Sequence, residues 1–145
     1  MGRADESVES VMRREFASVA SKERLDLVDD VMNLGRVRHL PVLDDGRLVG
    51  VVSQRDLLAA GLSKALDFDG SQRRTFMRSV EVAEVMARNP ITVRPDASLR
   101  EAARLMVQHR IGCLPVVDEA GRPVGLVTET DLLRGVYEID APEEA

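Results

Sequence analysis

The chain contains one sequence phrase twice, and this internal repeat constrains the fold more than any other feature. The first copy is RVRHLPVLDDGRLVGVVSQRDLL, residues 36–58, and the second is IGCLPVVDEAGRPVGLVTETDLL, residues 111–133. Each copy has a β-branched run, a turn rich in acidic residues and glycine, a second β-branched run and a polar helix start. A strand–turn–strand–helix phrase that occurs twice predicts two structural units of the same kind.

The repeat extends beyond this phrase toward the amino terminus. Val11-Met12 matches Val85-Met86 at an offset of 74 residues. The turn between the two strands is one residue longer in the second copy, so the offset after this turn is 75. Each copy has the pattern of a short helix, a short strand, a helix, two strands and a last helix. We therefore expect an α/β fold of two pseudo-symmetric units. The expected ranges are 1–66 for the first unit with its amino-terminal helix, 67–79 for a linker, 80–140 for the second unit and 141–145 for a tail.

The second helix expected in each copy, which follows the short strand, carries a regular apolar face. In the second copy Ser98 and Glu101 have the spacing of a capping box at its start. In the first copy a second apolar stripe is present, and its members are Leu27, Val31 and Leu34. A helix that is apolar on two sides needs two partners. We expect one partner to be its own sheet, and the other to be a second copy of the chain or the linker.

Composition and charge disfavour several classes of protein. The chain has 25 acidic and 20 basic residues, a net charge of −5 and a pI near 5.1, which disfavours a nucleic-acid partner. Cys113 is the only cysteine, so no intramolecular disulfide forms and a reducing compartment is expected. Neither a signal-peptide core nor an apolar run of the roughly 18–20 residues that span a bilayer is visible. We expect a soluble, cytoplasmic protein without a membrane partner.

The expected linker contains a short basic run. SQRRTFMRS, residues 71–79, carries three arginines. Such a run is typical of a solvated surface. A site for an anionic ligand is the alternative interpretation.

Catalytic patterns are weak in this sequence. His39 and Cys113 occupy equivalent positions in the two copies, but a Cys–His nucleophile also needs an orienting third group, which no motif supplies. No cluster has metal-ligand spacing, and the glycine-rich phosphate and dinucleotide motifs are absent. We therefore expect no enzymatic activity, no metal and no cofactor; a Cys–His enzyme is the alternative from a different class.

Both copies place a hydroxyl and, three residues later, an aspartate where the last strand meets the last helix. The pairs are Ser53 with Asp56 and Thr128 with Asp131. This spacing is typical of a helix cap. Its recurrence also suits a nucleotide, because a helix N-terminus attracts phosphate and a carboxylate accepts hydrogen bonds from the two hydroxyls of a ribose. The second interpretation describes a nucleotide receptor that catalyses no reaction.

The doubled pattern resembles a tandem pair of CBS domains, the regulatory unit called a Bateman module, over residues 8–139. The resemblance rests on the two Val-Met pairs and on the blocks HLPVLDDGRLVGVVSQRDLL and CLPVVDEAGRPVGLVTETDLL. RVRHLPV and the linker ending in RSVEVAEVM are similar to stand-alone CBS proteins of the acetoin-utilisation type. The resemblance implies two β-α-β-β-α units packed through their sheets. It also implies two symmetry-related clefts that bind adenosine compounds such as AMP, ADP, ATP, S-adenosylmethionine or NAD.

The resemblance further implies which residues bind the ligand. In such pairs the aspartates contact ribose, the hydroxyls before them face phosphate, and a polar residue on the first short strand lies near the base or ribose. Basic residues leading into the next strand contact phosphate. The implied ligand-binding residues are Ser18, Arg38, His39, Ser53 and Asp56 in the first copy and Thr92, Thr128 and Asp131 in the second.

The two copies differ at the basic positions. Where the first copy has Arg38 and His39, the second has Gly112 and Cys113. Only the first copy therefore supplies phosphate-binding charge at these positions, although His39 also suits a packed, structural histidine. The difference favours the first copy as the nucleotide site. The second copy is expected to take a less charged adenosine compound or to stay empty.

Together these observations predict a non-enzymatic regulatory module. It binds an adenosine-containing small molecule, and the expected compound is an adenine nucleotide that acts as a regulatory ligand and not as a cofactor. The module is also expected to form a homodimer and to signal to an effector protein. A structural CBS dimerisation module without a ligand is one alternative. A module that binds S-adenosylmethionine or NAD is another.

Overall fold

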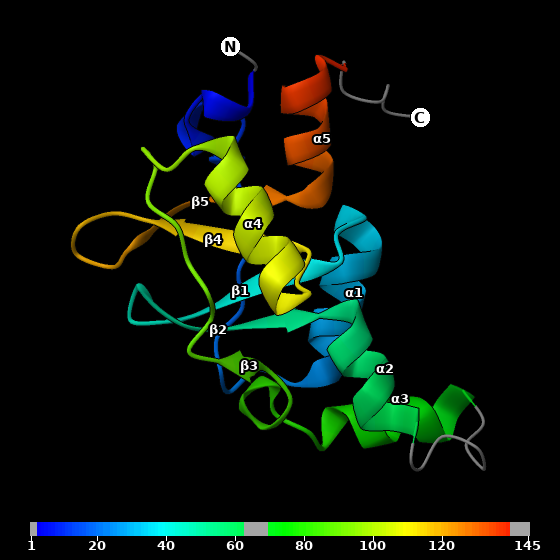
Figure 1. Ribbon diagram of the computed structural model, residues 1–145. Coiled ribbons are helices and arrows are strands. Elements are labelled where there is room, and N and C mark those ends of the chain that lie inside the picture. The colour runs from blue at the N-terminus through cyan, green and yellow to red at the C-terminus, as the bar shows by residue number, and fades with distance from the viewer. Residues whose placement is uncertain (1–2, 63–69, 140–145) are drawn as a thin grey trace. The chain divides into compact units, whose positions relative to one another are not determined.

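The computed structural model describes residues 3–62 and 70–139 (Figure 1). The 3-10 helices are η1 (Arg3–Asp5), η2 (Val8–Ser10) and η4 (Val82–Glu84). The α-helices are α1 (Leu25–Gly35), α2 (Gln54–Leu62), α3 (Gly70–Arg78), α4 (Leu99–His109) and α5 (Glu129–Tyr137). The strands are β1 (His39–Asp44), β2 (Arg47–Ser53), β3 (Ala87–Arg88), β4 (Cys113–Val117) and β5 (Pro123–Thr128). The predicted α/β class is confirmed.

Contacts divide the chain into two compact units. We call residues 17–90 the Asp56 unit, and residues 3–16 together with 91–139 the Asp131 unit. Each has one long helix, α1 or α4, followed by an antiparallel hairpin and a further helix, α2 or α5. The two predicted pseudo-symmetric units are therefore present. The ranges 1–66 and 80–140, predicted from the order of the repeat, group the chain differently from its contacts.

The segment that opens each repeat packs in the unit of the other repeat. In the Asp131 unit, Arg13 pairs antiparallel with Leu126. In the Asp56 unit, Ala87 pairs antiparallel with Val51. By the repeat offsets, Arg13 matches Ala87 and Leu126 matches Val51, so these are the same pair in the two units. An opening segment thus reaches a hairpin more than a hundred residues away in one unit, and fewer than forty away in the other.

Both hairpins form where the sequence predicts them. In the first, Asp45 and Gly46 have φ angles of 52° and 76°, the double left-handed turn that matches the twist of two paired strands. A register shift follows Val42 in this hairpin and Val116 in the second. The short strands predicted around Val19 and Val93 are single parallel bridges to the first strand of each hairpin.

Each unit has an apolar core of aliphatic side chains at matching positions. Fully buried hairpin members are Leu40, Val42 and Val52 in the Asp56 unit and Leu114, Val116 and Val127 in the Asp131 unit. Burying one such side chain contributes about 1.5–3 kcal/mol. The remaining buried members of each core come from helices and connecting segments, such as Leu25 of α1 and Leu99 of α4. The buried members of the two cores are valine, leucine, methionine and alanine side chains, which is consistent with the scarcity of aromatic residues in the chain.

The structure confirms the Ser98 half of the capping box predicted at the start of α4 and the predicted apolar face of this helix. Ser98 Oγ accepts a hydrogen bond from the backbone N–H of Glu101 at 3.0 Å. Leu99 and Met106 on the predicted apolar face are buried. The cap satisfies one of the N–H groups that a helix start leaves without a partner.

The second apolar stripe of α1 is largely open. Leu27 and Leu34 are 43% and 87% exposed, although Val31 packs against the core of the Asp56 unit. The linker explanation therefore covers only part of the stripe. The prediction that a second copy of the chain covers the rest is taken up under the proposed function.

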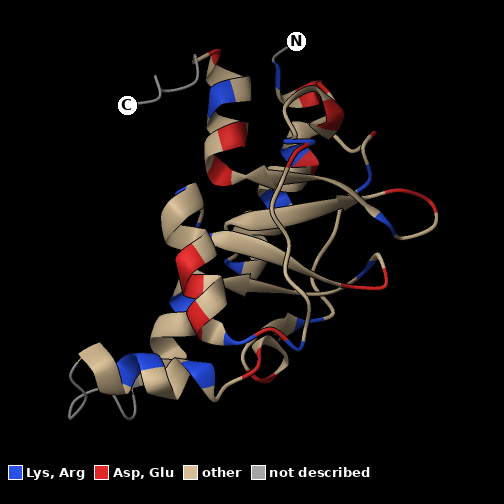
Figure 2. Cartoon of the chain, turned by 180° about the vertical axis from the view of Figure 1, so that it is seen from behind, with Lys and Arg blue, Asp and Glu red and all other residues tan. Residues whose placement is uncertain are grey.

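Part of the predicted linker is the helix α3, which packs beside α1. Arg74 pairs with Asp30 at 3.0 Å and Arg78 lies 3.4 Å from Asp26, so two cations of the basic run face acids of α1. Figure 2 shows where basic and acidic residues lie along the chain. Met77 of the same helix is buried in the core. The sequence also predicts that Leu62, Ala65 and Leu66 extend α2, but residues 65 and 66 lie outside the described residues.

Candidate functional site

Each Ser/Thr-x-x-Asp motif lies where a hairpin ends and a helix begins. In the Asp56 unit, Asp56 Oδ2 accepts a hydrogen bond from Ser53 N at 2.8 Å, and Ser53 Oγ accepts one from Asp56 N at 3.1 Å. In the Asp131 unit the matching distances are 2.9 Å for Thr128 N to Asp131 Oδ2 and 3.3 Å for Asp131 N to Thr128 Oγ1. Both motifs are therefore capping boxes. Oδ2 of each carboxylate belongs to the cap. The groups around Oδ1 are what distinguish the two units.

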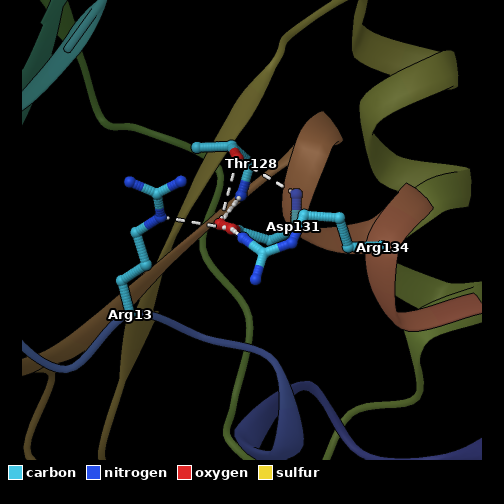
Figure 3. Close-up of polar contacts among 4 residues, drawn as sticks. All are labelled: Arg13, Thr128, Asp131 and Arg134. Carbon is cyan, nitrogen blue, oxygen red and sulfur yellow. Dashed lines mark hydrogen bonds and ion pairs between the residues drawn. The ribbon is translucent and has the colours of Figure 1, made fainter. Parts of the chain in front are cut away.

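The Oδ1 atom of Asp131 faces two arginines (Figure 3). Arg13 Nε donates to it at 3.1 Å, and Arg134 Nη1 lies 3.9 Å away. The Thr128 hydroxyl donates a second hydrogen bond to Oδ2, at 2.9 Å. The Asp131 side chain is only 2% exposed, so its charge depends on these partners for compensation.

The Asp56 carboxylate has a different environment. The repeat offsets match Arg13 with Ala87 and Arg134 with Ala59, so alanine replaces both cations. Within residues 3–62 and 70–139 no ion pair reaches Asp56, and Ser53 N is the one hydrogen-bond donor found on its carboxylate. Asp56 is half-buried. An acceptor oxygen without a cation is therefore specific to this unit in the described part of the chain.

Four of the predicted site residues of the first copy converge at one end of the β1–β2 hairpin. His39 is the strand partner of Ser53, and the carbonyl of Arg38 accepts a hydrogen bond from Gln54 N at 2.8 Å, at the start of the helix that carries Asp56. The Arg38 side chain is exposed. The hairpin register thus places these four residues at one end of the hairpin.

The remaining predicted residues lie on the short segments that bridge to each hairpin. Ser18 is exposed and precedes Val19, whose N–H bonds the carbonyl of Pro41 at 3.1 Å. Thr92 is half-buried and precedes Val93, which makes the same bond to Pro115. The two side chains therefore lie at equivalent positions. In each unit the first strand of the hairpin separates this segment from the strand that ends at the Ser/Thr-x-x-Asp motif.

Cys113 is chemically quiet in this fold. Its side chain is buried, and burial together with the negative charge of Asp131 raises the pKa of the thiol to about 12, against a smaller opposing effect of Arg13. At neutral pH the sulfur is protonated and is a poor nucleophile. His39, its partner in the Cys–His alternative, belongs to the Asp56 unit. Among the described residues, no group of three or more His, Cys, Asp or Glu side chains is arranged to hold a metal ion.

Sequence reasoning missed Arg13 and Arg134. Both directly follow repeated words, since Arg13 comes after Val-Met and Arg134 after Asp-Leu-Leu, and alanine stands at the same points of the other copy. An alignment of the two copies shows both differences. That they meet at one carboxylate depends on the exchange of opening segments, which the sequence pattern does not reveal.

Comparison with known families identifies the repeat. A family model described as the CBS domain matches the chain twice, at residues 8–63 and 82–138. The chain belongs to the CBS domain family. The resemblance to a tandem CBS pair is thereby confirmed.

Relatives and solved structures agree with this membership. A CBS domain-containing protein of Dictyostelium discoideum is 35% identical over 127 residues, which are 87% of this chain and 88% of that protein. The chain covers 29%, 47% and 25% of three other curated relatives, one of them an inosine-5'-monophosphate dehydrogenase of Korarchaeum cryptofilum. CBS pairs thus also occur as parts of longer proteins.

Three solved CBS-pair structures resemble this one closely. A protein of Vibrio cholerae described as an acetoin utilization protein has a TM-score of 0.77 at 34% identity, covering 93% of this chain and 94% of its own. CBSX2 in complex with AMP, a protein also solved from Arabidopsis thaliana, has a TM-score of 0.77 at 29% identity, covering 92% and 98%. The CBS pair of protein MJ0100, solved with 5'-methylthioadenosine and S-adenosyl-L-methionine, has a TM-score of 0.74 at 26% identity, covering 88% and 93%.

The helices of the described residues are too short or too polar to cross a membrane.

Proposed function

We propose that this CBS pair is a regulatory module that binds an adenine nucleotide through the Asp56 unit and signals its occupancy to a partner protein. The observation that carries the proposal is the Asp56 carboxylate, which caps its helix through Oδ2 and has no cation on it among the described residues. Related pairs of similar fold hold AMP in one case and S-adenosyl-L-methionine with 5'-methylthioadenosine in another.

The chemistry of the Asp56 unit suits a nucleoside phosphate. A carboxylate accepts hydrogen bonds from both hydroxyls of a ribose. Arg38 lies at the same end of the hairpin with an exposed guanidinium, which forms strong charge-assisted hydrogen bonds with phosphate. Ser53 retains a hydroxyl proton to donate, because its oxygen serves the cap only as an acceptor. Ser18 and His39 complete the proposed set, and Thr92, Thr128 and Asp131 are its counterparts in the other unit.

A thermal-shift panel tests the proposal. The compounds are AMP, ADP, ATP, S-adenosylmethionine, NAD and a cyclic dinucleotide. A ligand present at 100 times its dissociation constant stabilises the folded state by about 2.7 kcal/mol, which raises the melting temperature of a chain of this size by several degrees. The absence of a shift with every compound contradicts the proposal.

A homodimer is part of the proposal. The exposed stripe formed by Leu27 and Leu34 on α1 is apolar surface of the kind that mediates association. Leu34→Glu is expected to convert a dimer into a monomer in size-exclusion chromatography with light scattering. Gln108→Glu, at the matching position of α4, is the control and leaves the mass unchanged. A wild-type chain that elutes as a monomer contradicts this part of the proposal.

The same stripe favours a second candidate function, a CBS dimerisation module that binds no ligand. In that case the dimer is expected in light scattering, but no compound of the panel shifts the melting temperature. We further propose that the protein acts in the cytoplasm, where a reducing environment preserves its single free cysteine.

A further inference from the structure

We infer that the CBS pair has one adenosine site per chain, because Arg13 and Arg134 occupy the carboxylate of Asp131 and close the second site to ribose. This inference rests on the proposed function, in which Asp56 binds the ribose. It assigns a new role to two residues: they determine which of the two aspartates accepts the ligand.

The hydrogen bonds on Asp131 leave little acceptor capacity for a ribose. A carboxylate has about four lone-pair sites. Oδ2 accepts hydrogen bonds from Thr128 N and from the Thr128 hydroxyl. Oδ1 accepts a hydrogen bond from Arg13 Nε, and Arg134 Nη1 lies 3.9 Å from the same oxygen. Because the side chain is 2% exposed, a sugar hydroxyl reaches it only by displacing a guanidinium. A neutral hydroxyl is a weaker donor than the cation that it would replace.

Arg13 is held in place by its backbone. Arg13 N donates to Leu126 O at 2.8 Å, and Leu126 N donates to Arg13 O at 3.0 Å. Met12, the preceding residue, packs so closely on the hairpin that a Cβ at Gly125 would lie 2.7 Å from its sulfur. The segment is thus anchored on both sides of the point where the guanidinium leaves the backbone, and displacement of Arg13 by a ligand is opposed by this anchoring.

The Asp56 unit is the internal control for this inference. Ala87 makes the same antiparallel pair, with Val51, that Arg13 makes with Leu126. Ala59 stands three residues after Asp56, as Arg134 stands three residues after Asp131. The backbone frame is therefore common to both units, and the two cations are the difference at the carboxylate.

The experiment exchanges these residues between the units and measures AMP binding by titration calorimetry. The wild-type chain is expected to bind one AMP per chain. Ala87→Arg places a cation beside Asp56 and is expected to weaken AMP binding about tenfold or more, as loss of a charged hydrogen bond does. Arg13→Ala combined with Arg134→Ala is expected to add a second binding event. The single and the double variant each introduce only residue types that the other unit already carries at the matching position. Circular dichroism verifies that both variants fold.

Point variants of the aspartates distinguish this inference from the proposed function. Asp131→Ala is expected to leave AMP affinity unchanged, whereas Asp56→Ala lowers it. Two AMP molecules per wild-type chain, or an equal loss in both variants, overturns the inference and leaves the proposed function intact. If the wild-type chain binds none of AMP, ATP and S-adenosylmethionine, the proposed function fails. Binding by the Arg13→Ala, Arg134→Ala chain alone would then overturn the claim of one site per chain and support only the claim that the two arginines close Asp131 to ribose, and no binding by either chain overturns both claims.

Discussion

Arg13 and Ala87 hold the same position in the two units, each paired antiparallel with the second strand of a hairpin, yet only Arg13 reaches a carboxylate. The residue that matches Asp131 is Asp56, and its carboxylate has no ion pair within the described residues. Two nearly symmetric units thus carry the same capping motif in different electrostatic environments. This asymmetry lies in the side chains and not in the backbone.

The two aspartates are expected to differ in their contributions to stability. Asp56→Ala removes one hydrogen bond to a half-buried carboxylate and is expected to lower the free energy of unfolding by about 1 kcal/mol. Asp131→Ala removes the Thr128 bonds and the Arg13 pair, and a loss of about 2–4 kcal/mol is expected. The value stays below that of a fully buried pair because Arg13 is 50% exposed and regains water. Urea unfolding followed by far-UV circular dichroism measures both losses. Equal losses would show that the Arg13–Asp131 ion pair does not contribute to the free energy of unfolding.

Gly50 and Gly125 are expected to be intolerant of a side chain. A Cβ at Gly50 would lie 2.6 Å from the sulfur of Met86 and 2.8 Å from the carbonyl oxygen of Ala87, and Gly125 faces Met12 at 2.7 Å in the same way. Gly50→Ala and Gly125→Ala should each cost about 1–3 kcal/mol by overpacking.

Gly61→Ala is the matched control for these glycine variants. Nothing lies within 4 Å of a Cβ at this position of α2. Alanine is the better helix former, by up to about 1 kcal/mol, so this variant is expected to be neutral or stabilising. Thermal unfolding separates the two classes, and a neutral Gly50→Ala would contradict the observed packing of Met86.

Asp44 is expected to contribute to stability in a pH-dependent manner. The Ser21 hydroxyl, at 2.6 Å, and then the Ser21 backbone N–H, at 3.0 Å, hold the pKa of Asp44 below its ordinary value, with a smaller effect from Lys22. A lowered pKa means that the stabilisation is complete above the unfolded-state pKa, about 3.9, and is lost as pH falls through the lower folded-state value.

Ser21→Ala measures this contribution. The variant should melt below the wild type at pH 6, and the difference between the two should shrink as the pH falls from about 5 through the folded-state pKa of Asp44. A difference that grows on acidification would show that the sign of the pKa shift is wrong.

Cys113 is expected to react with thiol reagents only when the chain unfolds. The residue is 6% exposed, and the pKa of its thiol is raised to about 12. Labelling with a chromogenic disulfide at pH 8 should therefore be slow in buffer and fast in denaturant. Cys113→Ser is expected to retain the nucleotide-dependent thermal shift. Rapid labelling of the folded protein would reopen the Cys–His alternative.

Local features of this fold could be predicted from the sequence because neighbours in the chain determine them. Asp45-Gly46 specifies its own turn, and Ser98 finds its partner three residues later. Ser53 and Asp56 likewise form the predicted cap within one helical turn. Of these features, the Ser/Thr-x-x-Asp cap is present in both copies, since Thr128 and Asp131 form the same bonds.

Interactions between distant segments could not be predicted in the same way. Arg13 and Asp131 are 118 residues apart, and no periodicity or motif relates them. Their contact follows from the exchange of opening segments, a tertiary arrangement that the order of the repeat conceals. The helix α3 was also missed, because its mean hydropathy is low and Gly70 and Ser71 are typical of a linker. Its burial of Met77 depends on packing against α1.

The most direct test of the central claim is a crystal structure of the chain grown with AMP. The account predicts the two ribose hydroxyls within hydrogen-bond distance of the Asp56 carboxylate, the phosphate near Arg38 and Ser53, and Asp131 still paired with Arg13. A ribose bound to Asp131, or AMP bound away from Asp56, would contradict it.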